Sequence, residues 1–156
     1  MDRIPALRRA GRCGTGATET VSAFPGPDVE LTTILVVSDV DRARDFWRDV
    51  VGAEVFREYG GTSCVLRLAG AWVLLVTGGG PTADKPDVTF APAADPARVD
   101  HAFTMRVADC QAAYAELRDR GAVFLTPPVS SDWEVRAFFR DPDGHLLEIS
   151  EALAPS

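Results

Sequence analysis

The sequence is poor in cysteine and in long apolar runs, and each shortage excludes a class of protein. Its three cysteines, Cys13, Cys64 and Cys110, have no CxxC spacing, which is typical of a reducing compartment rather than of a disulfide framework. The longest apolar runs, such as 71–76, fall far short of the roughly 20 residues that span a bilayer. We therefore expect a cytoplasmic protein with no membrane partner, in which Cys64 and Cys110 are buried as small hydrophobic residues.

Basic charge is also scarce. Sixteen Lys and Arg stand against 23 Asp and Glu, which gives a net charge of -7. This balance repels phosphate backbones, and no basic patch with interleaved aromatics is present, so we expect no nucleic-acid partner. A chain of 156 residues with 46% hydrophobic residues is typical of one globular domain with a real core.

Residues 1–30 differ in kind from the rest of the chain. Four arginines lie within the first 16 residues, followed by small polar residues and FPGPD, without the apolar stretch of a secretory signal. We expect a disordered tail, with an arm that docks on a partner as the alternative.

Regular patterning begins at Leu31 and predicts a first βαβββ module over 31–76. An apolar, β-branched strand is followed by Ser38 and Asp39, which can cap a helix that ends at Gly52. Phe46 and Trp47 lie on the face of this helix expected to pack against a sheet. Two strands around Gly60 and Gly61, and a third after Gly70, complete the module.

A linker over 77–99, rich in Gly and Pro, leads to a second module over 100–151. Here VVSD (36–39) aligns with RVAD (106–109) at an offset of 70 residues, which indicates an internal repeat. A strand, a helix that stops at Gly121, and strands over 122–128, 133–140 and 145–150 are expected. Asp141 and Asp143 are expected to form the last turn, with His145 in a structural role.

Three motifs resemble the glyoxalase/bleomycin-resistance/dioxygenase group, the vicinal oxygen chelate superfamily: ILVVSDVDRARDFWRDVVGAEV, FTMRVADCQAAYAELRDRGA and FFRDPDGHLLEI. The resemblance covers residues 31–151. It implies an α+β fold of two βαβββ modules whose curled mixed sheets form a cup, with the helices on the outer face. It also implies a homodimer and, in catalytic members, a divalent metal such as Zn, Fe, Mn or Ni, held by residues of the first and last strands of each module.

Most of those metal positions lack a good ligand in this chain. Thr32 occupies the usual histidine position of the first strand, and Leu74 replaces the carboxylate of the last strand of module one. In module two the count lands on Ala102, and His101 lies one residue early, which points it away from the cup unless a bulge intervenes. Glu148 fits the pattern. Because His101 and Glu148 fall short of three protein ligands, we expect no metal cofactor, with a metal held by these two residues as the alternative.

Alternation along the strands predicts an apolar cup lining with one Trp, one Arg and one Glu. Such a lining suits a flat hydrophobic small molecule, on which Trp72 stacks and whose carboxylate or phenolate Arg106 grips. In the alternative, Arg106 and Glu148 pair with each other. The predicted ligand-binding residues are Thr32, Ile34, Trp72, Leu74, Thr104, Arg106, Leu146 and Glu148.

Three functions remain open on the sequence alone. The first is a metal-free protein that binds a small hydrophobic or aromatic molecule. The second is a lyase, isomerase or dioxygenase in which Glu148 is the general base or a metal ligand together with His101. The third is a degenerate module retained for dimerisation or regulation, with no ligand in the cup.

Overall fold

The structure, a computed structural model, describes residues 24–27 and 29–153. The chain divides into two units, residues 1–30 and 31–156, and the tail predicted over 1–30 lies almost wholly outside the described residues. No helix in the described part is long and apolar enough to cross a membrane.

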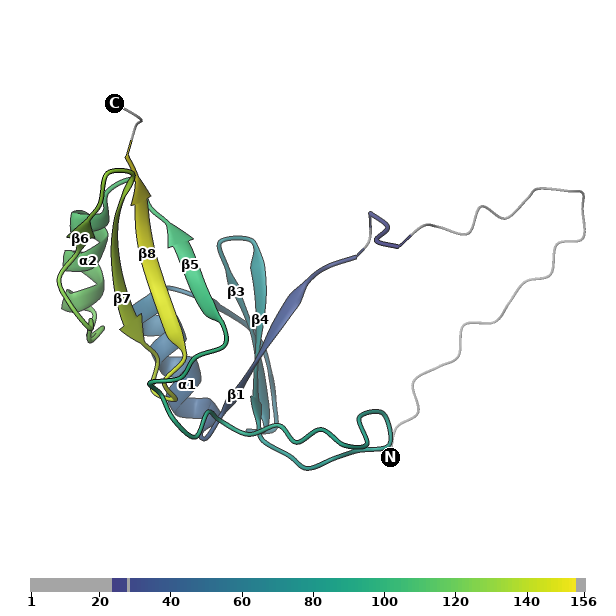
Figure 1. Ribbon diagram of the computed structural model, residues 1–156. Helices are drawn as coiled ribbons and strands as arrows, with labels where there is room; N and C mark the ends of the chain where they lie inside the picture. The colour runs from purple at the N-terminus through teal and green to yellow at the C-terminus, as the bar shows by residue number, and fades with distance from the viewer. Residues whose placement is uncertain (1–23, 28, 154–156) are drawn as a thin grey trace, which may run out of the picture. The chain divides into compact units, whose positions relative to one another are not determined.

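The first half of the larger unit is a βαβββ module (Figure 1). Its sheet has the order β1-β4-β3-β2, with β1 parallel to β4 and the other neighbours antiparallel. Asp39 caps the helix by accepting a hydrogen bond from the Arg42 amide at 2.9 Å, and Gly52, with φ of 88°, ends the helical segment. Its elements are β1 (Thr32–Val37), α1 (Val40–Phe46), the π-helical turn η1 (Trp47–Val51), β2 (Glu54–Tyr59), β3 (Ser63–Leu68) and β4 (Ala71–Thr77).

The second half repeats this plan, with the sheet order β5-β8-β7-β6 and β5 parallel to β8. Asp109 caps its helix through the Ala112 amide at 2.8 Å. Helix α2 covers the outer face of this sheet, as Figure 1 shows, and each sheet is open, which confirms the predicted α+β fold of two modules. The elements are β5 (Ala102–Arg106), α2 (Cys110–Asp119), β6 (Val129–Ser130), β7 (Glu134–Arg140) and β8 (Leu146–Ala152).

The prediction of a strand over 122–128 was wrong. This segment makes only an isolated bridge from Phe124 to Phe139, and the regular strand β6 starts after it and has two residues. Pro127 and Pro128 lack the amide hydrogen that a strand needs for its ladder, so pairing cannot continue through them.

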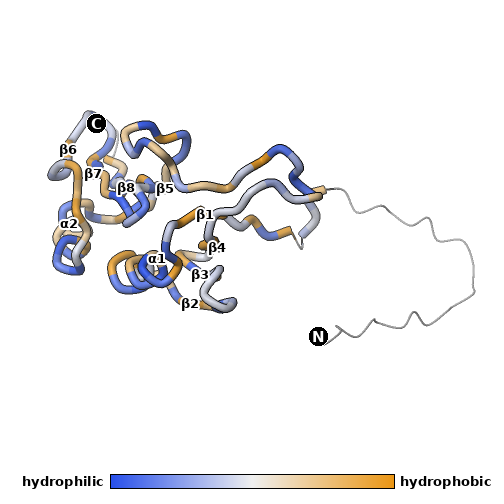
Figure 2. Tube along the Cα trace, turned by 90° about the horizontal axis from the view of Figure 1, so that it is seen from below, coloured by the Kyte–Doolittle hydropathy of each residue, from blue (hydrophilic) through white to orange (hydrophobic). Residues whose placement is uncertain are grey.

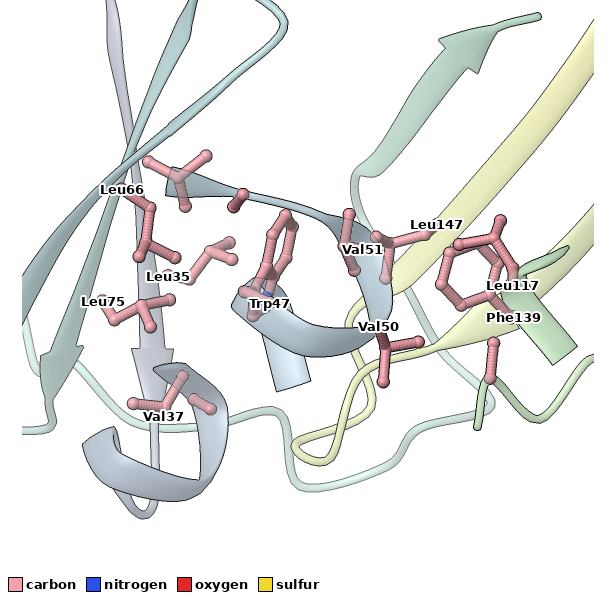
Figure 3. Close-up of a cluster of buried hydrophobic side chains, with 14 of the residues drawn as sticks. Leu35, Val37, Trp47, Val50, Val51, Leu66, Leu75, Leu117, Phe139 and Leu147 are labelled. Atoms are coloured by element: carbon pink, nitrogen blue, oxygen red, sulfur yellow. The ribbon is translucent and has the colours of Figure 1, made fainter. Parts of the chain in front are cut away.

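The core of the larger unit is built around Trp47, which is completely buried. Figure 3 shows its ring between apolar side chains of the first sheet and the η1 turn, and beyond that turn lie Leu147 and Phe139 of the second sheet. Both helices carry hydrophilic and hydrophobic positions, as expected for helices with one buried face (Figure 2). The two modules therefore share one continuous hydrophobic core.

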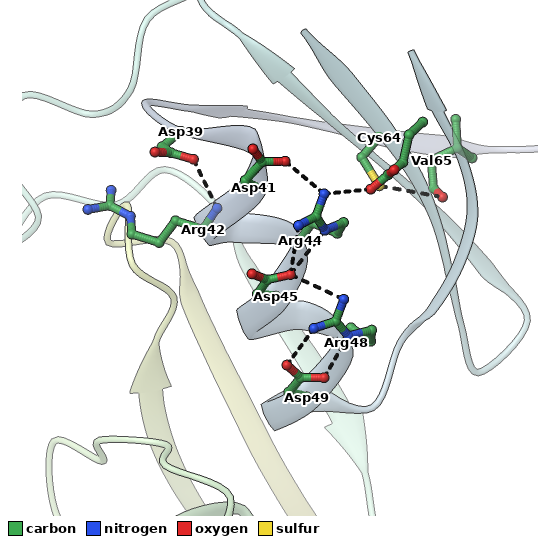
Figure 4. A network of polar contacts seen from close by, with 10 residues as sticks. Asp39, Asp41, Arg42, Arg44, Asp45, Arg48, Asp49, Cys64 and Val65 are labelled. Carbon is green, nitrogen blue, oxygen red and sulfur yellow. Dashed lines mark hydrogen bonds and ion pairs between the residues drawn. The ribbon is translucent and has the colours of Figure 1, made fainter. Parts of the chain in front are cut away.

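The outer surface of α1 carries a chain of ion pairs (Figure 4). Arg44 contacts Asp41 and Asp45 on its own helix, and its Nη1 lies 2.7 Å from Oε1 of Glu58 on β2. Hydrogen bonds to Glu58 and Asp45 raise the pKa of Arg44, so its charge is permanent. These contacts tie the helix to the edge of the sheet, and we assign them a structural role.

Candidate functional site

The predicted residues of module one lie on one face of the first sheet. Thr32 is in register with Trp72, and Ile34 with Leu74. They alternate along β1 and β4 with buried residues such as Leu35. Ile34 is 45% exposed although it is aliphatic, so this face is only partly covered in a single chain.

The predicted residues of module two pair in the same way across β5 and β8. Ala102 is in register with Leu146, and Thr104 with Glu148. The Thr104 hydroxyl donates a hydrogen bond to Oε2 of Glu148 at 2.7 Å. One carboxylate oxygen of Glu148 is thus fixed by the neighbouring strand.

A cavity of about 310 Å³ lies where β5 approaches β1 and the β3–β4 hairpin. It brings Trp72 of module one together with Thr104 and Arg106 of module two, which are 30 or more residues away in sequence. The other predicted ligand-binding residues, Thr32, Ile34, Leu74, Leu146 and Glu148, do not line it. The lining residues are Thr33, Leu68, Ala69, Ala71, Trp72, Val73, Phe103, Thr104, Met105 and Arg106.

Trp72 is held in place by two neighbours that the sequence reasoning missed. Phe56 meets its ring edge-on, with centroids 5.0 Å apart, and the Arg67 guanidinium lies 5.2 Å from the ring centroid. Both contacts are of the kind that stabilises an indole. Arg67 could have been found by counting back from the hairpin turn at Gly70, because it is the cross-strand partner of Trp72.

Arg106 does not pair with Glu148. Its Nη1 donates to the Ser150 hydroxyl at 2.7 Å and lies 3.6 Å from Oε2 of Glu134. Ser150 in turn donates to Glu134 at 2.9 Å, and Arg136 contacts the other oxygen of Glu134 at 3.1 Å. Continuing the alternation two residues beyond Glu148 identifies Ser150, which is in register with both arginines.

The turn over 141–145 connects the two modules. The buried Asp141 carboxylate accepts hydrogen bonds from Trp47 Nε1 at 3.2 Å and lies 2.7 Å from Nδ1 of His145. Asp143 accepts from the amide and the hydroxyl of Ser38 at 2.8 and 2.6 Å. Burial opposes protonation of His145, but the hydrogen bond to Asp141 and the charges of Asp141 and Asp143 outweigh it and raise the pKa of the imidazole.

The sequence matches the family model of the Glyoxalase/Bleomycin resistance protein/Dioxygenase superfamily over residues 30–149. The chain belongs to this superfamily. None of the proteins with curated functions matches the sequence.

Solved structures of the superfamily share the fold of this member. A glyoxalase/bleomycin resistance protein/dioxygenase from Nocardioides is 20% identical with a TM-score of 0.68, and the match covers 84% of this chain and 87% of that one. TnmS3, an antibiotic binding protein from Streptomyces sp. CB03234, is 22% identical with a TM-score of 0.58, covering 81% and 97%. Lactoylglutathione lyase from Agrobacterium tumefaciens is 21% identical with a TM-score of 0.59, covering 80% and 94%. At such identities the likeness establishes the fold alone.

The donor set of this superfamily member does not fit the metal centre that the resemblance implies for catalytic relatives. His101 precedes β5 instead of lying on it, and its ring meets Phe103 edge-on at 6.0 Å, whereas Glu148 lies on β8 and accepts a hydrogen bond from Thr104. Within the described ranges no three His, Cys, Asp or Glu side chains gather in a way that could hold a metal.

Proposed function

We propose that this superfamily member binds a small, flat hydrophobic molecule with an anionic group, without a complete metal site. The observation that carries the proposal is the 310 Å³ cavity in which Trp72, Phe103 and Met105 lie beside Arg106. Its volume is at the lower end of the roughly 300–1,000 Å³ range of small-molecule sites. Trp72 offers a stacking surface, and Arg106 offers the single cationic group in the lining.

The charge balance around Arg106 supports an anionic ligand. Glu134 is shared between Arg106 and Arg136, so Arg106 does not have a carboxylate to itself. The Arg106 side chain is 64% exposed, which leaves donors free for a second partner. Guanidinium groups bind carboxylates and similar anions through several hydrogen bonds at once.

Two related dyes separate the apolar and the anionic parts of this site. Anilinonaphthalene sulfonate is flat, aromatic and anionic, and N-phenylnaphthylamine is its neutral counterpart. Trp72→Ala is expected to weaken both dyes by tenfold or more, measured by fluorescence titration. Arg106→Gln is expected to weaken the sulfonate about tenfold and to leave the neutral dye unchanged, because only the former has a charge for Arg106 to pair with.

Matched controls come from residues outside the cavity. Trp133 is 68% exposed and does not line it, so Trp133→Ala is expected to leave both affinities unchanged, and so is Arg57→Gln on the exposed surface of β2. Equal binding of both dyes by Trp72→Ala and the parent would refute the proposed site. An equal affinity of the parent and of Arg106→Gln for the sulfonate dye would refute the proposed contact between Arg106 and an anionic group.

A second candidate function is catalysis with Glu148 as general base, in a lyase or isomerase reaction. It is favoured by the hydrogen bond from Thr104, which lines the cavity, to Glu148. That bond fixes one oxygen and leaves the other available to take a proton next to a carbonyl group. With any substrate that is turned over, Glu148→Gln should remove turnover while binding survives, and unchanged turnover would reject Glu148 as the base.

We also propose that the protein is a cytoplasmic homodimer. Each of the two described sheets has two edge strands, β1 and β2 in the first and β5 and β6 in the second, and exposed Ile34 lies on the open face of the first sheet. Unpaired edges and exposed apolar faces favour association with another chain. Sedimentation equilibrium of the full chain should give twice the mass of one chain, and a concentration-independent monomer would contradict the proposal.

A further inference from the structure

The chain contains two histidines, and the fold brings them together although they are 44 residues apart. The ring centroids of His101 and His145 lie 6.2 Å apart. Both line one small hollow of about 30 Å³, formed where the chain enters β5 and where the turn before β8 ends. A hollow of this size accommodates an ion or one or two water molecules.

Each imidazole is held by a carboxylate through the same ring nitrogen. Nδ1 of His101 lies 2.6 Å from Asp100, and Nδ1 of His145 lies 2.7 Å from Asp141. No hydrogen bond to Nε2 of either ring is formed within the described residues. A neutral imidazole that donates through Nδ1 carries its lone pair on Nε2. Carboxylates in this position are the usual outer partners of metal-binding histidines, since they fix the tautomer and the ring orientation.

The separation of the rings is about 1 Å larger than that of two imidazoles on a tetrahedral ion. With a Zn–N bond of about 2.0–2.1 Å, two imidazoles on one ion have centroids roughly 5 Å apart at a tetrahedral angle and about 6 Å apart only when the N–metal–N angle opens toward linear. The His101 side chain is 52% exposed, so its ring can turn toward His145 to share one ion with it. We propose that His101 and His145 together bind one borderline divalent ion of the Zn²⁺, Ni²⁺ or Cu²⁺ class, whose remaining positions are filled by water. Imidazole is a good ligand for each of these ions.

The local charge agrees with a cation. Arg98 also lines the hollow, but the carboxylates of Asp100 and Asp141 on the two rings outweigh its single positive charge. Glu148 does not line this hollow, and neither does Trp72. The site is therefore separate from both the Glu148 position and the cavity proposed for the hydrophobic ligand.

Zinc titration of tag-free full-length protein, stripped with chelator and carrying Cys13→Ser to remove a competing thiol, tests the proposal. Calorimetry is expected to give one Zn²⁺ per chain. Proton–carbon NMR is expected to show both imidazole signals shifting together as that one equivalent is added. Because each ring carries one distinct signal, the spectrum reports directly on the two residues.

Two exposed positions keep the test independent of folding. The His101 side chain is 52% exposed and that of Asp100 is 95% exposed, so His101→Ala and Asp100→Asn should fold normally. We expect at least a tenfold loss of Zn²⁺ affinity for His101→Ala and about a 10- to 100-fold loss for Asp100→Asn, the usual effect of removing an outer carboxylate. Glu148→Gln should bind Zn²⁺ like the parent.

Three results would overturn the proposal: a shift of only one imidazole signal, an affinity unchanged in His101→Ala, or a loss of binding in Glu148→Gln. The last would return the metal to the strand position that the superfamily resemblance implies. Binding of the two dyes is expected to be the same with and without Zn²⁺, so failure of this site leaves the hydrophobic cavity untouched.

Discussion

Replacement of Asp141 by alanine should destabilise the protein more than any other single change in the turn over 141–145. The Asp141 side chain is completely buried. Its Oδ1 accepts the amides of Asp143 and His145 at 3.0 and 2.9 Å, and its Oδ2 receives the indole of Trp47 and lies within hydrogen-bond distance of the His145 ring. Trp47 is 94 residues away on the first module, so the substitution removes a link between modules and not only a turn.

The expected loss of stability in Asp141→Ala depends on the hydrogen-bond donors that the substitution leaves without an acceptor. Hydrogen bonds to a charged group contribute about 1.5–3 kcal/mol each, but part of this is recovered where water reaches the freed donor. The His145 side chain is only 9% exposed and Trp47 Nε1 lies in the core, so water reaches neither of these two donors easily. Breaking a buried ionic pair on one side costs about 3–5 kcal/mol, and we expect Asp141→Ala to lower the free energy of unfolding by about that amount.

Urea denaturation followed by Trp fluorescence and far-UV circular dichroism measures the effect. Asp141→Asn keeps an oxygen for the two amides but presents an NH₂ group to the donors of Trp47 and His145, so about half of the loss is expected. Asp87 is exposed and makes no side-chain hydrogen bond in the described part of the chain, so Asp87→Ala should stay within about 0.5 kcal/mol of the parent. A loss below about 1 kcal/mol for Asp141→Ala would refute the view that this turn joins the modules.

Three further outcomes follow from packing and burial. A Cβ at Gly78 would lie 2.6 Å from the carbonyl oxygen of Phe90, so Gly78→Ala should cost about 1–3 kcal/mol in urea denaturation; a neutral result would contradict the packing of the 78–90 loop. Burial raises the pKa of Cys64 and Cys110 above the usual 9.0. In a Cys13→Ser variant, a disulfide reagent at pH 8 should therefore label neither thiol until urea unfolds the chain. Because their pKa is raised in the folded state, these thiols contribute stability at pH values below 9.0, and this contribution declines as the pH rises above 9.0. Rapid labelling of the native protein would contradict their burial. Thr32→His, on the exposed face of β1, should change the unfolding free energy by less than about 0.5 kcal/mol.

Much of the fold could be predicted from the sequence because local signals agreed with one another. Asp39 caps its helix as its position before an apolar periodic segment indicated, and Asp109, its counterpart in the internal repeat, caps the second helix in the same way. Trp47 is buried on the helix face that the periodicity selected. The failure over 122–128 has a physical cause, since apolar content favoured a strand and the two prolines prevented its ladder. Hydrophobicity alone does not show which backbone amides can donate hydrogen bonds to a neighbouring strand.

The candidate site was predictable only in part, because alternation gives the face of a residue but not its partner. Trp72, Thr104 and Arg106 do line one cavity, yet the acidic partner of Arg106 comes from β7 rather than from Glu148 on β8. Strand order decides that choice, and it is a property of the sheet rather than of any one segment. The meeting of His101 with His145 was missed for the same reason, since it depends on β5 lying beside β8.

The two faces of the first sheet are under separate physical constraints, so its fold does not depend on which side chains occupy the positions that the superfamily resemblance assigns to metal ligands. On β1, Leu35 and Val37 are buried in the shared core, whereas Thr32 and Ile34 are exposed. A substitution on the first set leaves a cavity and costs several kcal/mol, but one on the second set removes no core contact. Residue 32, which the superfamily resemblance assigns to a metal ligand, belongs to the exposed set, so histidine and threonine there are expected to be nearly equivalent for folding and very different for chemistry. A change of residue type at such a position is therefore expected to leave the fold in place, and in the binding function proposed above Trp72 and Arg106 determine which molecule is bound.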